Sequence, residues 1–494
     1  MLNNILTGNR KNRTIFISII AIFVLRIVFI SIMGLMPQDA YYYFYSQHPA
    51  LSYFDHPPVL AYIIRGFTAV FGRHVFVLKL ADTIITLLSV LAFYLLSRRF
   101  LSSHRAGNAV AIFFSTLMLT ILSLVSTPDV PLILFWCLSL LALYTAVFSE
   151  KKYYWILAGI FMGLAFDSKY TGIFLPAGLV LFLLLSNKYR KLIFSPWPWI
   201  SMFFFLVTVS PVIIWNIQTQ FASFKFQSSE RAGSVQINPL GFFGVIGHQS
   251  AILIPVLLLI LITILYKSFK KYIVKRISID AKKLFLFSFF LPVFFGFLAI
   301  SWFYWVKLNW MMPAYITGII LASIYTTRRL IRIQLIFSLV VHFLLAVEVL
   351  FYPVPIRSDD TWVGWDNLSE QIRVLKNKYP GSFIFSADDY KTSAVLNFYS
   401  SEFVYGRNII GEPALQFDYI GTDLSALKGR NAIFLNSMPR FKNEEKENQF
   451  PPTLMSYFDR VTEQDPILIK KNGKTVRKFL VFECGNYRGP KMGK

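Results

Sequence analysis

The sequence is poor in cysteine and in charged residues. Its 494 residues include two cysteines, Cys137 and Cys484, and no Cys-x-x-Cys pair. This excludes a disulfide framework and gives no support for a cysteine-ligated metal or redox centre. Only 15% of the residues are charged and 55% are hydrophobic, whereas soluble domains usually carry about a quarter charged residues. The composition therefore indicates an integral membrane protein.

Acidic residues are scarcest in the first part of the chain. Residues 1–352 hold nine of the 26 acids but 29 of the 49 lysines and arginines. The last 142 residues carry the other 17 acids and have the composition of a soluble domain. We therefore predict a membrane domain at 1–352, with a first external loop at 37–75, and a soluble domain at 353–494.

Long apolar runs, by contrast, are abundant. A helix of about 20 apolar residues spans a bilayer, and the runs predict a mainly α-helical, polytopic protein with about eleven spans. The runs at 153–167 and 171–187 are short, because Asp167-Ser168-Lys169 interrupts them. The first run is too long for a signal sequence, so we expect it to be retained. The eleven runs are 14–36, 76–97, 107–126, 130–149, 153–167, 171–187, 198–217, 240–266, 284–305, 313–327 and 333–352.

The basic residues of the first part predict an orientation, because lysine and arginine favour cytoplasmic loops. With the N-terminus in the cytoplasm, 21 basic residues fall on the cytoplasmic side and six on the opposite side. The net charge of +23 is then a topology signal, and we expect no nucleic-acid partner. With eleven spans, the soluble C-terminal domain is expected to lie outside the cytoplasm.

Five of the nine acids map to external loops or external helix ends. Ionisable groups near a bilayer are costly and mark functional sites, so this clustering predicts an active site at the outer membrane surface. Asp82 and Glu348 fall inside spans. The five external acids are Asp39, Asp55, Asp129, Asp167 and Glu230.

The first external loop is the richest in candidates. Its aromatic segment, which includes Tyr43 and precedes His48, suits an amphipathic helix in the headgroup region, where most of the tyrosines would form an interfacial belt. That interpretation does not explain Asp39, nor Asp55-His56 before two prolines that fix the backbone. His56 could also be only a hydrogen-bonding side chain.

The other external loops leave two interpretations open. Asp129 could cap a helix or belong to a site. Lys169 could pair with Asp167 or meet a phosphate. Glu230-Arg231 could be a solvated pair or part of a site.

Lys307 and Asn309 lie between Trp305 and Trp310 at the end of a span. Lys307 could be a snorkelling anchor or one of several cations that converge on a phosphate. Lys169 and Arg231 share its predicted face.

These segments resemble the bacterial GT-C glycosyltransferases of the dolichyl-phosphate-mannose protein mannosyltransferase-like family, whose lipid A branch includes the aminoarabinose transferase. The first loop, Asp39-Ala40-Tyr41-Tyr42 through His48, is the most specific part. The aminoarabinose branch has Glu-Lys where this chain has Asp55-His56, which leaves the sugar and the acceptor open. The segments that carry the resemblance are 39–48, 53–58, 127–132, 168–171, 307–310, 387–390 and 397–399.

The resemblance implies a polyprenyl-phosphate sugar donor in the inner membrane and an acceptor on the periplasmic face, lipid A or another envelope glycolipid. It places the family's essential aspartate on Asp39. It also implies basic groups or a divalent metal at the donor phosphate. We expect a monomer surrounded by membrane lipids.

The residue types fit this chemistry. A departing lipid phosphate needs its charge held, for which Lys169, Arg231, Lys307 and Asn309 are candidates. Asp55 and His56 could bind Mg²⁺, Mn²⁺ or Zn²⁺. Asp39 is the candidate general base for a hydroxyl acceptor, and attack opposite the leaving phosphate would invert the anomeric centre. Further candidates for the site are Tyr43, His48, Asp129 and Glu230.

Two alternatives remain. A transporter or flippase of lipid-linked sugars would use Asp82 and Glu348 near the midplane, but we find no internal repeat. The same chemistry could also act on a protein acceptor.

The C-terminal domain is predicted to be a small α/β domain. Its apolar runs lie at 383–385, 432–435 and 479–482, and a helical stretch lies at 391–399. It has no nucleotide-binding glycine motif.

Overall fold

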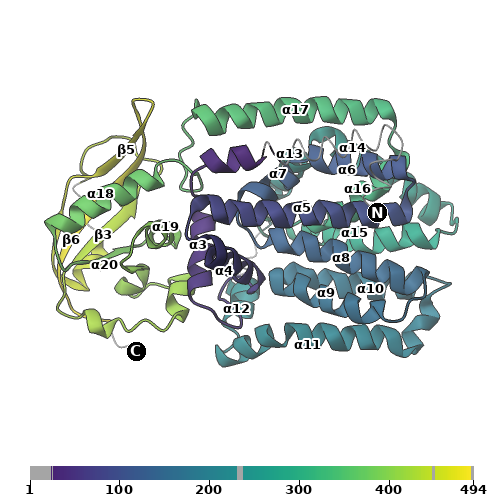
Figure 1. Cartoon of the computed structure of the whole chain (residues 1–494), viewed down its shortest axis with the longest axis horizontal. Helices are drawn as coiled ribbons and strands as arrows, with labels where there is room; N and C mark the ends of the chain where they lie inside the picture. Colours follow the sequence, from purple (N-terminus) through teal and green to yellow (C-terminus); the bar gives the residue numbers. More distant parts are fainter. Residues whose placement is uncertain (1–23, 25, 231–236, 448–450, 491–494) are drawn as a thin grey trace. The chain divides into compact units, whose positions relative to one another are not determined.

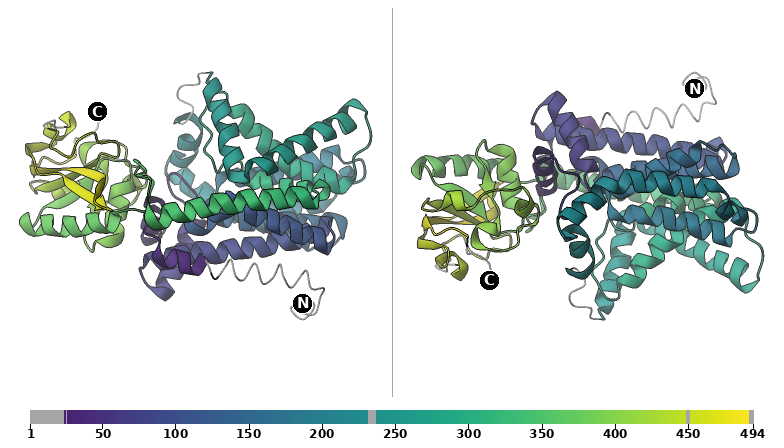
Figure 2. Two further views of the ribbon diagram at one scale, coloured as in Figure 1. Left: turned by 90° about the horizontal axis from the view of Figure 1, so that it is seen from above. Right: turned by 90° about the horizontal axis from the view of Figure 1, so that it is seen from below.

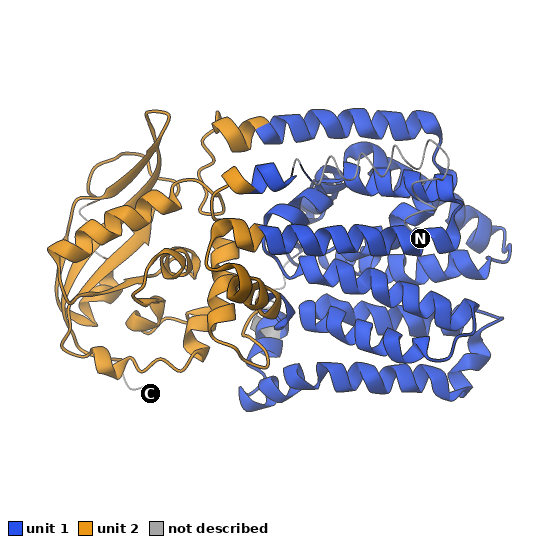
Figure 3. Cartoon of the chain, viewed as in Figure 1, with its two compact units in different colours: residues 1–30, 56–60, 80–346 blue, residues 31–55, 61–79, 347–494 orange. Residues whose placement is uncertain are grey.

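The structure, a computed structural model, describes residues 24, 26–230, 237–447 and 451–490 and divides into two compact units (Figure 3). Each unit is built from stretches that are far apart in the sequence. Unit 1 comprises the described residues up to Ile30 with His56–Leu60 and Leu80–Ala346; unit 2 comprises Ser31–Asp55, Ala61–Lys79 and the described residues from Val347 onward.

The described part of unit 1 is helical (Figure 1). Most of its helices are apolar on every side, as is typical of helices that lie in a membrane. In chain order the helices are α5 (Val75–Phe100, in this unit from Leu80), α6 (Ser103–Ser115), α7 (Leu117–Leu124), α8 (Asp129–Phe148), α9 (Tyr154–Ser168), α10 (Phe174–Leu185), α11 (Pro196–Gln218), α12 (Ala222–Lys225), α13 (Pro239–Leu253), α14 (Pro255–Ser268), α15 (Ala281–Ile300), α16 (Met312–Tyr325) and α17 (Arg328–Phe351, in this unit to Ala346). Short 3-10 or π-helical turns are η1 (Tyr170–Ile173), η2 (Arg190–Phe194), η3 (Phe226–Glu230) and η4 (Phe269–Val274).

The helices agree with the apolar runs of the sequence. Each run from 76 onward overlaps a helix or a pair of helices, and about half of the run at 14–36 lies outside the described residues. Five described helices are long and apolar enough to cross a membrane, or seven if each of two bent pairs counts as one. The mainly α-helical, polytopic fold is confirmed, whereas eleven spans remain a prediction.

Two of the expected spans are bent (Figure 2). The axes of α6 and α7 differ by 64°, and those of α13 and of the α14–η4 segment by 113°. At the second bend Pro255 has no N–H to donate, and Ile254 has a φ of 64°, so α13 ends at Leu253. At the first bend Thr116 is extended, and its hydroxyl donates to the carbonyl of Phe113 at 2.7 Å.

Unit 2 is an α/β unit. Its sheet has the order β2-β1-β3-β6-β4, with β5 also paired to β6. Strand β1 runs parallel to β2 and β3, and β6 runs antiparallel to its neighbours. The elements are α3 (Pro37–Gln47), α4 (Val59–Phe71, in this unit from Ala61), α18 (Trp365–Lys378), β1 (Phe383–Ser386), α19 (Lys391–Tyr399), β2 (Val404–Tyr405), η5 (Arg407–Ile410), η6 (Leu415–Tyr419), η7 (Ser425–Leu427), β3 (Ala432–Ser437), α20 (Pro452–Met455), β4 (Phe458–Glu463), β5 (Ile467–Lys471) and β6 (Lys474–Tyr487). The predicted C-terminal α/β fold is confirmed.

Helix α3, from the first loop, is part of the packed interior of unit 2. The ring of Tyr41 stacks on that of Tyr390 at 4.0 Å between centroids, and the ring of Tyr43 meets Phe398 edge-on at 5.0 Å. Tyr41 and Tyr43 are buried. The interpretation of these tyrosines as a membrane-interface belt is therefore wrong: their rings are buried in protein, because the C-terminal segments supply aromatic partners that the loop sequence alone does not reveal.

Candidate active site

Asp39 lies in the first turn of α3 and forms a buried ion pair. Its Oδ2 accepts the N–H of Met36 at 2.9 Å and the ammonium of Lys79 at 2.7 Å. The side chains of Asp39 and Lys79 are both fully buried. Pro37 starts the helix with a fixed φ, and a carboxylate in the first turn is stabilised by the helix dipole. The position of Asp39 is thus fixed by its own helix and by one lysine.

Lys79 is the partner that sequence reasoning missed. It lies near the start of α5, inside the apolar run at 76–97, and was therefore read as part of a span. Three residues later, Asp82 accepts a hydrogen bond from Ser126 at 2.6 Å. The signal was available, because two ionisable residues three positions apart in an apolar helix are costly unless they have partners or a role.

Asp55 belongs to the same unit as Asp39 and is tied to α3. The hydroxyl of Tyr41 donates to Oδ1 of Asp55 at 3.2 Å, and the backbone N–H of Gln416 donates to that hydroxyl at 3.3 Å. The Gln416 side chain also accepts the N–H of Phe54 at 2.8 Å. Residues of the first loop and of η6 therefore fix Asp55 together.

The segment around Tyr390 adds an acid with a perturbed pKa. Burial raises the pKa of the Asp388 carboxyl from 3.8 to about 7, although hydrogen bonds from Thr392 and Ser386 oppose the shift. Ser386 donates to Asp388 at 2.9 Å, and Thr392 also donates to it through its hydroxyl. Asp388 lies two residues before Tyr390, whose ring stacks on Tyr41 of α3.

The residues expected to hold a divalent metal do not form a complete ligand set. Asp55 is in unit 2 and His56 is in unit 1. Among the described residues, no three His, Cys, Asp or Glu side chains gather closely enough to hold a metal ion, whereas catalytic zinc sites usually supply three protein ligands. These residues therefore do not fit a fixed metal site, and a metal requirement stays a prediction.

A second buried cluster lies in unit 1. The ammonium of Lys169 contacts both carboxylate oxygens of Asp129 at 2.9 Å, and the side-chain amide of Asn309 donates to Asp129 Oδ2 at 2.5 Å. Asp129 and Lys169 are buried. The three residues come from the start of α8, the end of α9 and the loop before α16, so three predicted site residues are brought together.

This cluster corrects two interpretations of the sequence. The residue at the N-cap of α8 is Pro128, and Asp129 uses its carboxylate on Lys169 and Asn309 rather than on the helix end. Lys169 pairs with Asp129 and not with its sequence neighbour Asp167, because Lys169 turns to an extended backbone where α9 ends.

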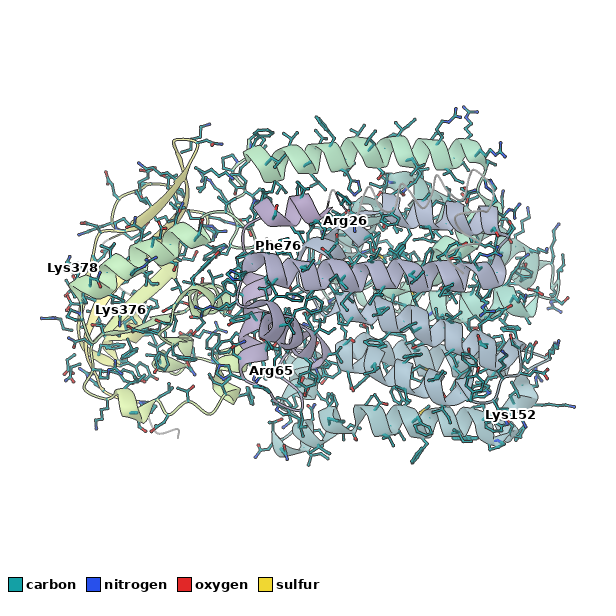
Figure 4. The ribbon with its side chains drawn as sticks, viewed as in Figure 1. Arg26, Arg65, Phe76, Lys152, Lys376 and Lys378 are labelled. Atoms are coloured by element: carbon teal, nitrogen blue, oxygen red, sulfur yellow. The ribbon has the colours of Figure 1, made fainter. Side chains whose placement is uncertain are left out.

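The other candidates are placed singly. The His48 ring, at the C-cap of α3, lies 4.7 Å from that of Phe44. Tyr43 is buried in unit 2, and Arg73 forms a side-chain hydrogen bond with it. Arg65, labelled in Figure 4, donates to the carbonyl of Ser46 at 2.8 Å. Lys307 is exposed. Glu230 is the last residue of η3, and Arg231 lies outside the described residues.

The fold and these buried ion pairs define a class: a multi-pass membrane protein with an appended α/β unit and acids on its loops. Residues 55–215 match the family model described as dolichyl-phosphate-mannose-protein mannosyltransferase. The family resemblance inferred from the sequence is confirmed over that region.

Relatives and one solved structure carry the likeness further. The chain is 26% identical over 181 residues to lipid A galacturonosyltransferase RgtD of Rhizobium johnstonii, covering 36% of this chain and 38% of that protein. It is 31% identical over 150 residues to the undecaprenyl phosphate-alpha-4-amino-4-deoxy-L-arabinose arabinosyl transferase of Pseudomonas aeruginosa, covering 29% and 27%. The chain thus aligns with less than half the length of these relatives.

The structure is similar to that of ArnT from Cupriavidus metallidurans bound to undecaprenyl phosphate. The TM-score is 0.61 at 14% identity, and the match covers 94% of this chain and 97% of that chain. The likeness extends over both units and shows that this chain has the ArnT fold.

Proposed function

We propose that this protein is an integral membrane glycosyltransferase that moves a sugar from a polyprenyl-phosphate donor to lipid A or another envelope glycolipid. The two relatives support this proposal, since one is a lipid A galacturonosyltransferase and the other an undecaprenyl phosphate-alpha-4-amino-4-deoxy-L-arabinose arabinosyl transferase. The ArnT structure that shares the fold was solved with undecaprenyl phosphate. The sugar is a hexose or a pentose.

One observation carries the proposal: the buried pair of Asp39, in the first loop, and Lys79, near the start of α5. It combines a carboxylate that can take a proton with an ammonium that can hold a negative charge. Asp39 takes the proton of the acceptor hydroxyl as general base. If the acceptor group is a phosphate, Asp39 instead orients it.

The reaction then exchanges one bond at the anomeric carbon for another. The acceptor oxygen forms the new bond to this carbon, and the bond to the donor phosphate breaks with its electron pair on the phosphate. Attack from the opposite face inverts the centre. The departing phosphate needs no proton, but its charge needs cations.

Cations of unit 1 serve the donor phosphate in this proposal. An ammonium has three N–H donors, so Lys169 can keep its contacts to Asp129 and still donate to a phosphate, with Asn309 beside it. Lys307 adds charge from the loop before α16, and Arg231, also predicted to serve the phosphate, lies outside the described residues. No step of this mechanism depends on a metal.

The cellular setting follows from the predicted orientation. The protein lies in a bacterial inner membrane as a monomer, with its N-terminus in the cytoplasm and its active site and C-terminal unit in the periplasm. Transfer to a protein acceptor is a second possibility that the same residues would support.

A purified system separates the enzyme from a flippase. Full-length protein in detergent is mixed with lipid A and with undecaprenyl phosphate carrying 4-amino-4-deoxy-L-arabinose or galacturonic acid, and products are measured by mass spectrometry. A flippase makes no product where there are no compartments. We expect transfer by the wild type and its loss, by about 10²–10⁴-fold, in Asp39→Asn. Wild-type protein that makes no product with these donors would contradict the proposal.

The control variant is Glu348→Gln, which changes an acid that a transporter would use. Glu348 accepts a hydrogen bond from the N–H of Val354 at 3.4 Å, at the end of α17. We expect this variant to transfer sugar at the wild-type rate. Equal activity of Asp39→Asn and wild type would remove Asp39 from catalysis.

A further inference from the structure

A large apolar groove lies in unit 1, apart from both buried ion pairs. Its volume is about 1280 Å³, and it is lined by α13, α14, η4, α15 and the segment after α10. This volume exceeds the 300–1,000 Å³ that is usual for small-molecule sites. Most of its walls are aliphatic or aromatic side chains, such as Leu258, Leu291 and Phe294.

The bend between α13 and α14 borders this groove. The two segments diverge by 113°, and α14 has several exposed apolar side chains. Ile262 is 48% exposed and Tyr266 is 65% exposed, and both line the groove. In a membrane helix such positions face lipid chains, so the groove opens to the bilayer.

One end of the groove is polar and basic. Lys188 and Lys282 line it, together with Ser186 and Asn187. The acid at this end, Asp280, caps α15 by accepting the N–H groups of Lys282 and Lys283 at 3.0 and 3.2 Å. Its charge is therefore held by the helix start, and the lysines dominate the field at this end.

An adjoining pocket extends the basic end. It has a volume of about 340 Å³, shares Asp280 and Lys282 with the groove, and adds Arg105 and Lys283. The predicted orientation places all of these residues on the cytoplasmic side. The external face, where the donor phosphate is proposed to bind, is at the opposite end of the spans.

We propose that this groove binds an anionic phospholipid of the cytoplasmic leaflet. Its acyl chain lies along α14 and α15, and its phosphate meets Lys188 and Lys282. The charge at the groove's end selects this occupant over the prenyl tail of the donor, whose phosphate belongs on the other side. The proposal goes beyond sugar transfer and does not depend on it.

Native mass spectrometry of the full-length protein tests the proposal. Detergent-purified protein is titrated with phosphatidylglycerol, with phosphatidylcholine of the same chains, and with undecaprenyl phosphate. We expect phosphatidylglycerol to bind in preference to phosphatidylcholine. Each lysine near a lipid phosphate is worth about fivefold, so Lys188→Gln/Lys282→Gln should weaken phosphatidylglycerol binding by roughly tenfold to 30-fold.

The matched control is Lys151→Gln/Lys152→Gln. These two lysines are exposed on the same predicted side but do not line the groove, and Lys152 is labelled in Figure 4. This control variant should bind phosphatidylglycerol as tightly as the wild type does. If both double variants bind phosphatidylglycerol equally weakly, the groove is not the binding site.

A second pair of variants tests the apolar part. Ile262→Trp fills the groove, whereas Leu259→Trp changes an exposed residue of the same helix that does not line it. Only Ile262→Trp should reduce the number of retained phosphatidylglycerol molecules. If Ile262→Trp instead removes undecaprenyl phosphate and leaves phosphatidylglycerol unchanged, the occupant is a prenyl chain and the proposal is wrong.

Discussion

The two buried ion pairs are alike in sequence and different in surroundings. In each, an aspartate in the first turn of a helix meets a lysine 40 positions later. Asp39 in unit 2 takes the backbone N–H of its own helix start as well as Lys79. Asp129 in unit 1 takes Lys169 and the amide of Asn309, 180 positions away. The first pair thus joins α3 to the start of α5, whereas the second ties together three segments of unit 1.

This difference suggests separate roles in the proposed reaction. Asp39 is held in place by α3. Two C-terminal segments of unit 2 hold α3 in turn, because Tyr390 stacks on Tyr41 and the N–H of Gln416 donates to the hydroxyl of Tyr41. A base needs such a fixed position. In the cluster of Asp129 and Lys169, the ammonium has one more N–H than its two contacts to Asp129 use, which could donate to a charged ligand. We therefore assign the chemical step to the first pair and donor binding to the second.

The largest expected effect comes from the first pair. Lys79→Met leaves Asp39 charged and buried without its ion partner, which should cost about 3–5 kcal/mol of stability. The double variant Asp39→Asn/Lys79→Met removes both charges and should recover most of that loss in thermal unfolding. Its turnover with saturating donor should stay at least about 10²-fold below the wild type. Recovery of turnover in the double variant would contradict the assignment of the chemical step to the pair of Asp39 and Lys79.

The second pair should change binding rather than turnover. Asp129→Asn/Lys169→Met also removes both charges, so we expect near wild-type stability. Losing a charge-assisted contact costs roughly 1.5–3 kcal/mol, which corresponds to about 10–150-fold weaker binding of undecaprenyl phosphate sugar. A titration followed by single-turnover kinetics separates the two quantities. A fall in turnover with unchanged donor affinity would reverse our assignment.

Lys307 should have a smaller effect than Lys169. Its side chain is exposed, and exposed ionic contacts are worth at most about 1 kcal/mol. Lys307→Met should therefore weaken the donor by up to about fivefold at low salt, and Lys307→Arg, which keeps the charge, by less. The same titration measures both variants. A fall as large as that of Lys169→Met would show that Lys307 closes over the phosphate.

A further prediction concerns stability and pH in unit 2. The carboxyl of Asp388 keeps its proton in the folded state up to its pKa of about 7, whereas the unfolded chain loses it near 3.8. The folded state therefore binds more protons between about pH 4 and 7, and stability falls as pH rises through this window. In Asp388→Asn the midpoint of thermal unfolding should fall less from pH 5 to pH 8 than in the wild type. A variant of the neighbouring exposed acid, Asp389→Asn, should follow the wild type.

The sequence was most informative where one chemical pattern decides the structure. Apolar runs gave the helices from 76 onward, and β1, α19, β3 and β6 appeared as predicted. The sequence was less informative where the structure depends on contacts between residues that are far apart in the chain. The loop sequence alone predicts a membrane-interface belt for the tyrosines of α3, because it does not reveal that Tyr390 and Phe398, more than 300 residues away, contact them.

The candidate site divides in the same way. Asp39, Asp129, Lys169 and Asn309 stood out as polar residues at the ends of apolar runs, and the last three indeed meet. Lys79 was missed because a single lysine does not interrupt an apolar run. Pairings across 40 or 180 positions depend on how helices pack, which periodicity does not specify.

Unit 2 is built from segments that lie far apart in the sequence, and this has a consequence for biosynthesis. Helix α3 leaves the ribosome well before its partners, because its side-chain hydrogen bond from Gln38 to Asp360 waits for a residue 322 positions later. At 5–20 residues per second, this takes roughly 15–60 s. The helix that carries Asp39 therefore spends most of synthesis without its aromatic and hydrogen-bonding partners. A ribosome that stops before these residues would release a chain in which α3 lacks its partners from unit 2.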